Sequence, residues 1–256
     1  MPADLDLDHV RGALARDGLN VTGVADGRSW DHVLPGCRSI LVFGSGGPRL
    51  FEAFLAWLRA APERLERLQH PLDDFVAACI AGADPEAPAH PAQRRWALCS
   101  AEGPPIDFRR LAVDAGLGWI SRTGLLLHPE HGLWLGLRAA LFTTTDLPRS
   151  GLPPGPGPCA SCAAPCVPAC PGGAMSGVST TAQPSAWDWR TCASFRVGQP
   201  CHARCDVRNA CPEGTGSRYS DLAQHYHSDP AGSGRTALAG TLRVAPGTGV
   251  DPGWKG

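Results

Sequence analysis

Apolar positions along the chain follow the helical period in some stretches and the strand period in others. Apolar side chains recur every three or four positions in residues 7–19 and 48–68, which predicts helices there. Short apolar runs predict buried strands. The remaining predicted elements are helices at 73–81 and 107–115 and strands at 21–25, 39–43, 95–99, 125–128 and 133–143, the last two joined as a hairpin by a turn at 129–132. This mixture predicts an α+β domain built in layers.

A change in composition divides the chain. Proline and glycine dominate residues 148–158, which is typical of a stiff linker. We therefore expect an α+β domain over residues 1–147 and a second domain over residues 159–228. Residues 229–256 are rich in Gly, Pro, Ser and Thr and have few bulky side chains, which predicts a flexible tail.

Cysteines dominate the second domain, which holds eight of the eleven in the chain. The first four follow the pattern Cys-x-x-Cys-x-x-x-Cys-x-x-x-Cys-Pro, and the second four also end in Cys-Pro. Closely spaced cysteines closed by Cys-Pro are typical of loops that bind iron–sulfur clusters, and two four-iron clusters require eight thiolates. The predicted metal ligands are Cys159, Cys162, Cys166, Cys170, Cys192, Cys201, Cys205 and Cys211.

The pairing of these ligands follows from the geometry of two-cluster ferredoxin loops. In such loops three cysteines bind one cluster, and the cysteine before proline binds the other. Here Cys211 would join the first three cysteines, and Cys170 would join Cys192, Cys201 and Cys205. Some gaps between cysteines are longer here than in the commonest bacterial run.

Structural zinc and disulfides are the alternatives for these cysteines. Zinc sites with four cysteines usually consist of two separated Cys-x-x-Cys pairs, and one ion does not need four cysteines in one short loop. Disulfides need an oxidising compartment, whereas the N-terminus is acidic and has no apolar signal segment, so we expect a cytoplasmic protein. The other cysteines, Cys37, Cys79 and Cys99, have apolar neighbours and are predicted to be core residues.

Charge and hydropathy exclude several functions. The formal net charge is −1, which does not indicate a nucleic-acid partner. Lys255 is the only lysine, which excludes Schiff-base chemistry and a P-loop. The longest apolar stretch, 133–142, is interrupted by Arg138 and is too short to span a membrane. His128 precedes the predicted turn at 129–132 and His131 lies within it, and we expect both side chains to be solvated.

A family resemblance appears in the segment before the linker. Residues 112–120 read Ala-Val-Asp-Ala-Gly-Leu-Gly-Trp-Ile and residues 125–132 read Leu-Leu-Leu-His-Pro-Glu-His-Gly, followed by the linker and the cysteines. This order, over residues 111–212, resembles the epoxyqueuosine reductases and related corrinoid iron–sulfur reductases. Residues 189–195, which contain Cys192, are similar to the family's lone ligand between its two cysteine loops.

The resemblance implies a fold and a set of cofactors. It implies a nitroreductase-like domain related to cobalamin-processing proteins, followed by a small ferredoxin-like domain with two [4Fe-4S] clusters. A cobalamin would lie between the domains, with Gly116, Gly118 and Trp119 as candidate cofactor-binding residues and Asp114 as the catalytic proton donor. The electron donor would be a flavodoxin, a ferredoxin or a flavin reductase, and the substrate a small molecule or a transfer RNA that carries the precursor of queuosine.

The chain also departs from the family pattern. The family motif usually continues Gly-Lys-x-Thr after Trp-Ile, whereas residues 121–124 read Ser-Arg-Thr-Gly. Residues 70–75 stand where the reductases have a Tyr- and Arg-rich stretch, so the substrate side differs as well. Three hypotheses therefore remain open: an oxidoreductase that passes electrons through two clusters to a cobalamin-type cofactor or a substrate, an electron carrier for a partner protein without cobalamin, and a zinc-stapled interaction protein.

Overall fold

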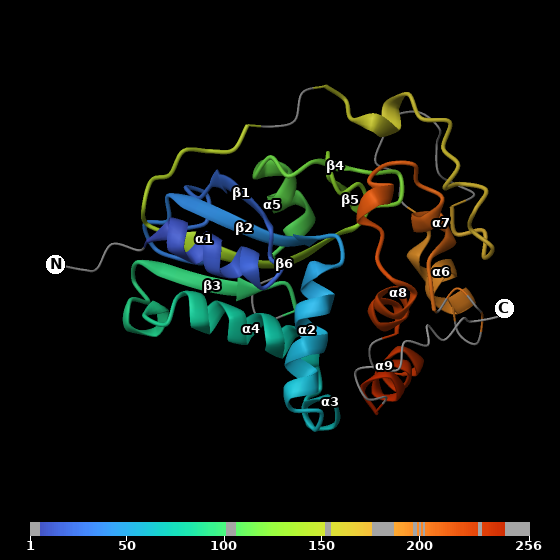
Figure 1. The fold of residues 1–256 in the computed structure, drawn as a ribbon. Helices are drawn as coiled ribbons and strands as arrows, with labels where there is room; N and C mark the ends of the chain where they lie inside the picture. Colours follow the sequence, from blue (N-terminus) through green and yellow to red (C-terminus); the bar gives the residue numbers. More distant parts are fainter. Residues whose placement is uncertain are drawn as a thin grey trace.

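A four-stranded antiparallel sheet forms the centre of the computed structural model, with the strand order β1-β2-β6-β3 (Figure 1). The structure describes residues 6–100, 106–151, 155–175, 187–196, 199, 201, 203–229 and 232–243. The strands of the sheet are β1 (Val21–Asp26), β2 (Ser39–Gly46), β3 (Arg94–Leu98) and β6 (Leu135–Thr143). Because β2 and β6 are paired on both sides, they form the buried middle of the sheet.

Both faces of the sheet are covered by helices. Along β2, Leu41 and Phe43 point into one apolar cluster, while Ile40 and Val42 point into the other, as the period of two in a strand requires. Helices α1 (Leu7–Arg16), α2 (Arg49–Ala60) and α4 (Pro71–Ala83) contribute to the first cluster, and α5 (Phe108–Asp114) contributes to the second. This arrangement confirms the layered α+β domain predicted from the sequence.

The other elements are short or lie near the cysteines. They are α3 (Arg64–Arg67), η1 (Ala87–Ala89), β4 (Trp119–Ile120), β5 (Leu126–Leu127), η2 (Pro158–Ala160), α6 (Trp189–Arg196), α7 (Asp206–Asn209), η4 (Thr215–Ser217), α8 (Asp221–Ser228) and α9 (Ser233–Arg243). Strands β4 and β5 pair with each other in a separate two-stranded sheet. Among the described residues, no helix is both long enough and apolar enough to cross a membrane.

Two predicted elements differ from the structure. The single helix expected over residues 48–68 is wrong, because α2 ends at Ala60 and Pro62 cannot continue it. The hairpin expected over residues 125–143 is also wrong, since β5 pairs with β4 whereas β6 pairs with β2 and β3. A single bridge between His128 and Gly132 is what joins the two segments.

The flexible tail expected over residues 229–256 is wrong for the part that forms α9. Leu238 of this helix is fully buried in the same apolar cluster as α2 and α4. The Arg235 side chain donates hydrogen bonds to the carbonyl oxygens of Leu65 and Leu68 at the end of α3. Residues 244–256 lie outside the described part of the chain.

Helix α8 also belongs to this core. Its Tyr226 ring lies 5.8 Å from the Phe51 ring and 5.5 Å from the Phe54 ring, measured between centroids, and both partners are on α2. Figure 1 shows α8 and α9 beside α2, although the cysteines separate them from it in the sequence. The chain therefore returns to the α+β domain after the cysteine-rich segment.

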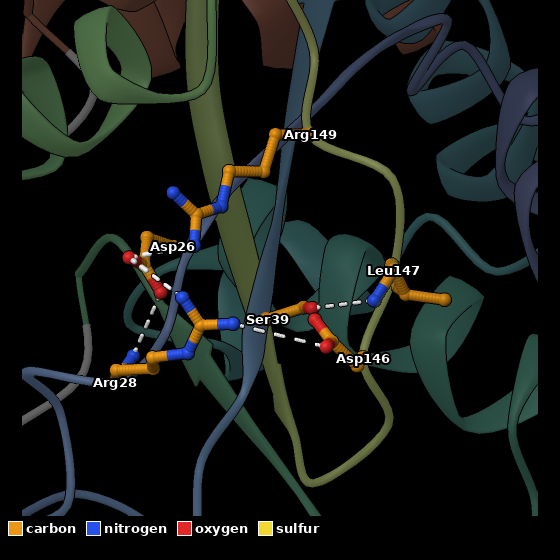
Figure 2. Close-up of polar contacts among 6 residues, drawn as sticks. All are labelled: Asp26, Arg28, Ser39, Asp146, Leu147 and Arg149. Carbon is orange, nitrogen blue, oxygen red and sulfur yellow. Dashed lines mark hydrogen bonds and ion pairs between the residues drawn. The ribbon is translucent and has the colours of Figure 1, made fainter.

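The chain segment after β6 is held against the edge of the sheet (Figure 2). The backbone N–H of Leu147 donates to Ser39 Oγ at 2.9 Å. Arg149 forms an ion pair with Asp26 at 2.8 Å. One step further along the chain, Ser150 and Val24 exchange two hydrogen bonds, at 3.0 and 2.9 Å. The first part of the expected linker is therefore fixed along β1.

Candidate functional site: two groups of cysteines

None of the eleven cysteines forms a disulfide. Cys37 and Cys79 are buried, as predicted for core residues, whereas Cys99 is exposed, so the prediction is wrong for Cys99. Among the eight cysteines of the second domain, Cys166 is buried, Cys205 is exposed and the others are partly buried. The structure therefore gives no support to the disulfide alternative.

Four cysteines line one small cavity. They are Cys159 on η2, Cys162 and Cys166 in the loop that follows, and Cys211 two residues after the end of α7. Burial raises the pKa of the Cys166 and Cys211 thiols, and negative charge at Cys159 raises both further. Cys211 is far from the other three in sequence, and the fold brings it to them. We call these four the first group.

The other four cysteines form the second group. Burial raises the pKa of the Cys192 and Cys201 thiols, and negative charge at Cys205 and Cys170 raises both further, whereas the Arg196 guanidinium opposes the shift. Cys192 lies on α6, and Cys205 directly precedes α7. Cys170 thus interacts with the later cysteines, although it is closer in sequence to the first three.

The eight thiols fit iron–sulfur clusters in kind and in number. Within the described residues, no three His, Cys, Asp or Glu side chains are arranged to hold one metal ion. A four-iron cluster brings its own inorganic core, and its four thiolates bind at separate corners, so they need not converge as closely as the ligands of one ion. Two groups of four thiols agree in kind and number with the ligands of two such clusters.

The backbone of the first cysteine loop adopts an uncommon conformation. Ala164 has a φ of +59°, and it is the one described residue other than glycine with positive φ. Its N–H group donates to Cys162 Sγ at 3.4 Å. A left-handed conformation costs a residue with a Cβ about 1–2 kcal/mol. Such backbone strain is frequent at binding sites, and here it directs a donor at a sulfur atom.

A buried arginine lies in the wall of the same cavity. Arg122 is 3% exposed, and its Nη1 donates to the carbonyl oxygen of Cys162 at 3.0 Å. The turn that carries it is fixed by Ser121 Oγ, which lies 2.8 Å from Thr123 Oγ1 and donates to the Leu125 carbonyl oxygen at 2.8 Å. The sequence showed that residues 121–124 depart from the family motif, but it did not indicate that Arg122 is buried beside the cysteines.

The glycine motif after α5 has a structural role. The N–H groups of Gly116 and Leu117 donate to the carbonyl oxygens of Val113 and Ala112, both at 2.9 Å, and Gly116 has a φ of +74°. These bonds end the helix in the manner of a Schellman motif, which favours glycine at this position. At Gly118, φ is +145°, and a Cβ there would lie 2.1 Å from a backbone oxygen.

A second cavity, of about 310 Å³, lies beside this motif. It is lined by Asn20, Val21, Thr22, Ala115, Gly116, Leu117, His128, Glu130, His131 and Ser150. Of the three predicted cofactor-binding residues, Gly116 lines it. Trp119 instead donates from Nε1 to the Gly155 carbonyl oxygen at 3.1 Å and packs against Gly157, so it holds the linker. The cavity is at the small end of the usual range for ligand sites.

Asp114, the predicted catalytic residue, lines neither of the two cavities. Its side chain is 48% exposed and forms an ion pair with Arg110, one helical turn earlier, at 3.1 Å. The structure thus gives Asp114 a surface contact, and its role as proton donor stays a prediction.

The histidine turn lies between the α+β domain and the cysteine-rich segment. His131 is buried, so the expectation of a solvated residue is wrong, and its Nδ1 lies 2.8 Å from Ser217 Oγ. The rings of His128 and His131 stack, with centroids 4.9 Å apart. Burial and the neighbouring His131 lower the pKa of His128 to about 4. Gly132 allows the turn to pack closely against the cysteine-rich segment, because a Cβ at this position would lie 2.1 Å from the Glu213 carbonyl oxygen.

The chain thus joins a layered α+β domain to a segment in which eight cysteines form two groups of four. In sequence, the chain is 33% identical to the epoxyqueuosine reductase of Synechococcus sp. (strain RCC307) over 166 residues, which are 60% of this chain and 44% of that relative. The chain thus spans less than half of that relative's length. No protein-family model matches it.

Solved structures of epoxyqueuosine reductase and of a B12-trafficking protein have a similar fold. A crystal structure of epoxyqueuosine reductase with an epoxyqueuosine-modified tRNA stem loop matches with a TM-score of 0.55 and 16% identity, covering 89% of this chain and 70% of that chain. The B12-trafficking protein CblC of C. elegans matches with a TM-score of 0.57 and 12% identity, covering 91% and 97%. Sequence and fold together show that this chain is similar to the epoxyqueuosine reductases.

Proposed function

We propose that this chain is an iron–sulfur oxidoreductase of the epoxyqueuosine reductase type. Two [4Fe-4S] clusters would pass electrons to a cobalamin-type cofactor or to a substrate held by the α+β domain. The observation that carries the proposal is the separation of eight thiols into two groups of four, each drawn from both halves of the cysteine-rich segment.

The cysteines would bind the clusters as the two groups already described. Bound clusters supply electrons at low potential, one at a time. The chain contributes the sulfur ligands, the Ala164 N–H that donates to Cys162 Sγ, and the partial burial that keeps water from the thiols. Burial and hydrogen bonds to sulfur are among the factors that set cluster potentials.

The cavity beside the glycine motif is the candidate site for the acceptor. It lies between β1, the motif after α5 and the histidine turn, and its lining includes polar groups at Asn20, Thr22, His128 and Ser150. At about 310 Å³ it would take a small ligand or one end of a larger one. The similarity to CblC supports a cobalamin, and the relative solved with a modified tRNA stem loop supports a substrate of that kind.

Anaerobic purification tests the proposal directly. We expect a brown protein with about eight irons per chain and a broad absorption band near roughly 400 nm, the signature of iron–sulfur clusters. A protein that contains zinc and no iron after anaerobic reconstitution would refute the proposal and favour the interaction protein.

Cobalamin binding is tested separately from cluster content. A ligand that binds the folded state alone must raise its thermal stability, so cobalamin should increase the melting temperature of the cluster-loaded protein and change the cobalamin spectrum. An iron-loaded protein with no such shift at saturating cobalamin would refute the cobalamin step and leave the electron carrier as the function.

A further inference from the structure

We propose that Arg122 sets the reduction potential of the cluster bound by the first group of cysteines and makes it higher than it would otherwise be. This inference rests on the proposed function, because it requires a cluster at those four thiols. It concerns a residue at which the chain departs from the family motif.

The position of Arg122 supports the proposal. Its side chain is 3% exposed and lines the same cavity as Cys159, Cys162, Cys166 and Cys211. The hydrogen bond from Nη1 to the Cys162 carbonyl oxygen ties the guanidinium to the backbone of the ligand loop. The charge is therefore fixed next to the thiols rather than free to move into solvent.

Electrostatics gives the direction of the effect. A four-iron cluster with four thiolates is anionic, and one-electron reduction adds one further negative charge. A nearby cation stabilises the reduced form more than the oxidised form, so it raises the potential. At an effective dielectric constant of about 20, unit charges roughly 10 Å apart interact strongly enough to shift an equilibrium more than tenfold. Arginine keeps its charge at all accessible pH values, so the effect persists across them.

Burial of the guanidinium strengthens the effect, because solvent screens a buried charge less than an exposed one. The ionisable groups that line the cavity with Arg122 are the four thiols and Glu213. A cluster held by the thiols would supply negative charge on the cavity side of the guanidinium.

The second group of cysteines provides an internal reference. Arg196 acts on Cys192 and Cys201, but it is only partly buried and its Nη2 donates to the Ser228 carbonyl oxygen. Its charge is screened more by solvent than that of Arg122. Substitution of Arg122 should consequently change the potential of one cluster and leave the other unchanged.

The test is an anaerobic redox titration of the cluster-loaded protein, followed by electron paramagnetic resonance. We compare wild type with Arg122→Gln, Arg122→Lys and, as a matched control, Arg109→Gln. Arg109 donates from Nη1 to the Gly124 carbonyl oxygen in the same turn, but its side chain is 56% exposed.

We expect Arg122→Gln to retain about eight irons and to show one cluster whose ratio of reduced to oxidised form falls about tenfold at a fixed potential. Arg122→Lys should restore most of this ratio, and Arg109→Gln should match wild type. Both clusters of Arg122→Gln titrating at their wild-type potentials would overturn the inference.

If Arg122→Gln loses iron, the Arg122→Lys variant decides whether the charge at this position has the proposed role. In that case an Arg122→Lys protein with both clusters and wild-type potentials supports the role of charge, whereas an Arg122→Lys protein that also loses a cluster overturns it. A wild-type protein without iron would instead refute the proposed function, and this outcome is independent of Arg122.

Discussion

Serine substitutions made in pairs can determine which cysteines share a cluster. A single Cys→Ser change that removes a ligand should destabilise one cluster and lower the iron content from about eight to about four per chain. One substitution cannot identify the group, because any of the eight gives the same number. Two substitutions can, since a second loss within the same group removes nothing further.

The structure predicts a different result for each pair. Cys170 and Cys205 belong to the second group, so Cys170→Ser combined with Cys205→Ser should retain about four irons, the same as either change alone. Cys166 and Cys205 belong to different groups, so their double substitution should leave almost no iron. Cys166→Ser with Cys211→Ser should again retain about four.

The assay is iron and acid-labile sulfide per chain after anaerobic reconstitution, with circular dichroism to verify folding. The control is Cys79→Ser, a buried cysteine in the core of the α+β domain that should keep about eight irons. The grouping is refuted if the Cys170/Cys205 double variant retains no iron while the Cys166/Cys170 variant retains about four. That result would mean that each loop binds its cluster with its own four cysteines.

Three further outcomes follow from the structure. Asp114→Asn and Arg110→Gln both remove the exposed ion pair, and each should lower the free energy of unfolding by less than about 1 kcal/mol. Turnover abolished in Asp114→Asn alone would establish Asp114 as a proton donor, whereas equal turnover in both variants would contradict that role. Leu238→Ala should lower the free energy of unfolding by about 3 kcal/mol, measured by urea denaturation, whereas a loss as small as that of a surface substitution would contradict the docking of α9. Because the pKa of His128 is lowered, the unfolded chain binds a proton at this residue between pH 6.5 and about 4, whereas the folded chain does not. The stability that neutral His128 contributes is therefore present above pH 6.5 and is lost as the pH falls through this window. A His128→Asn protein whose stability depends on acid pH as that of the wild type does would exclude His128 as the cause.

Local patterns predicted the elements whose apolar period is long and regular. The strands at β1 and β2 and the helices α1, α4 and α5 begin and end within a few residues of the predicted bounds. The layered α+β fold followed from them. The motif after α5 and the cysteine spacing indicated a resemblance to the epoxyqueuosine reductases, to which the chain is similar in sequence and in fold.

The predictions that were wrong, such as the hairpin over residues 125–143 and the flexible tail, failed for physical reasons. The apolar run of β6 indicated a strand but could not indicate its partners, because β2 and β3 are distant in sequence. Residues 233–243 contain few bulky side chains, yet one of them, Leu238, fills a space left by α2 and α4, and composition does not report such complementarity. The position of Arg122 could not be predicted either, since arginine is usually exposed and only the folded chain places it beside the thiols.

The return of α8 and α9 to the first domain affects the order in which the protein can be completed during synthesis. A ribosome makes the sheet and α2 first, then all eight cysteines, and last the two helices that cover Phe51 and Phe54. A nascent chain that has just exposed Cys211 still lacks the final layer of its own interior. The cysteine-rich segment therefore emerges while the domain is unfinished, so all eight cysteines leave the ribosome before α8 and α9 can complete the core.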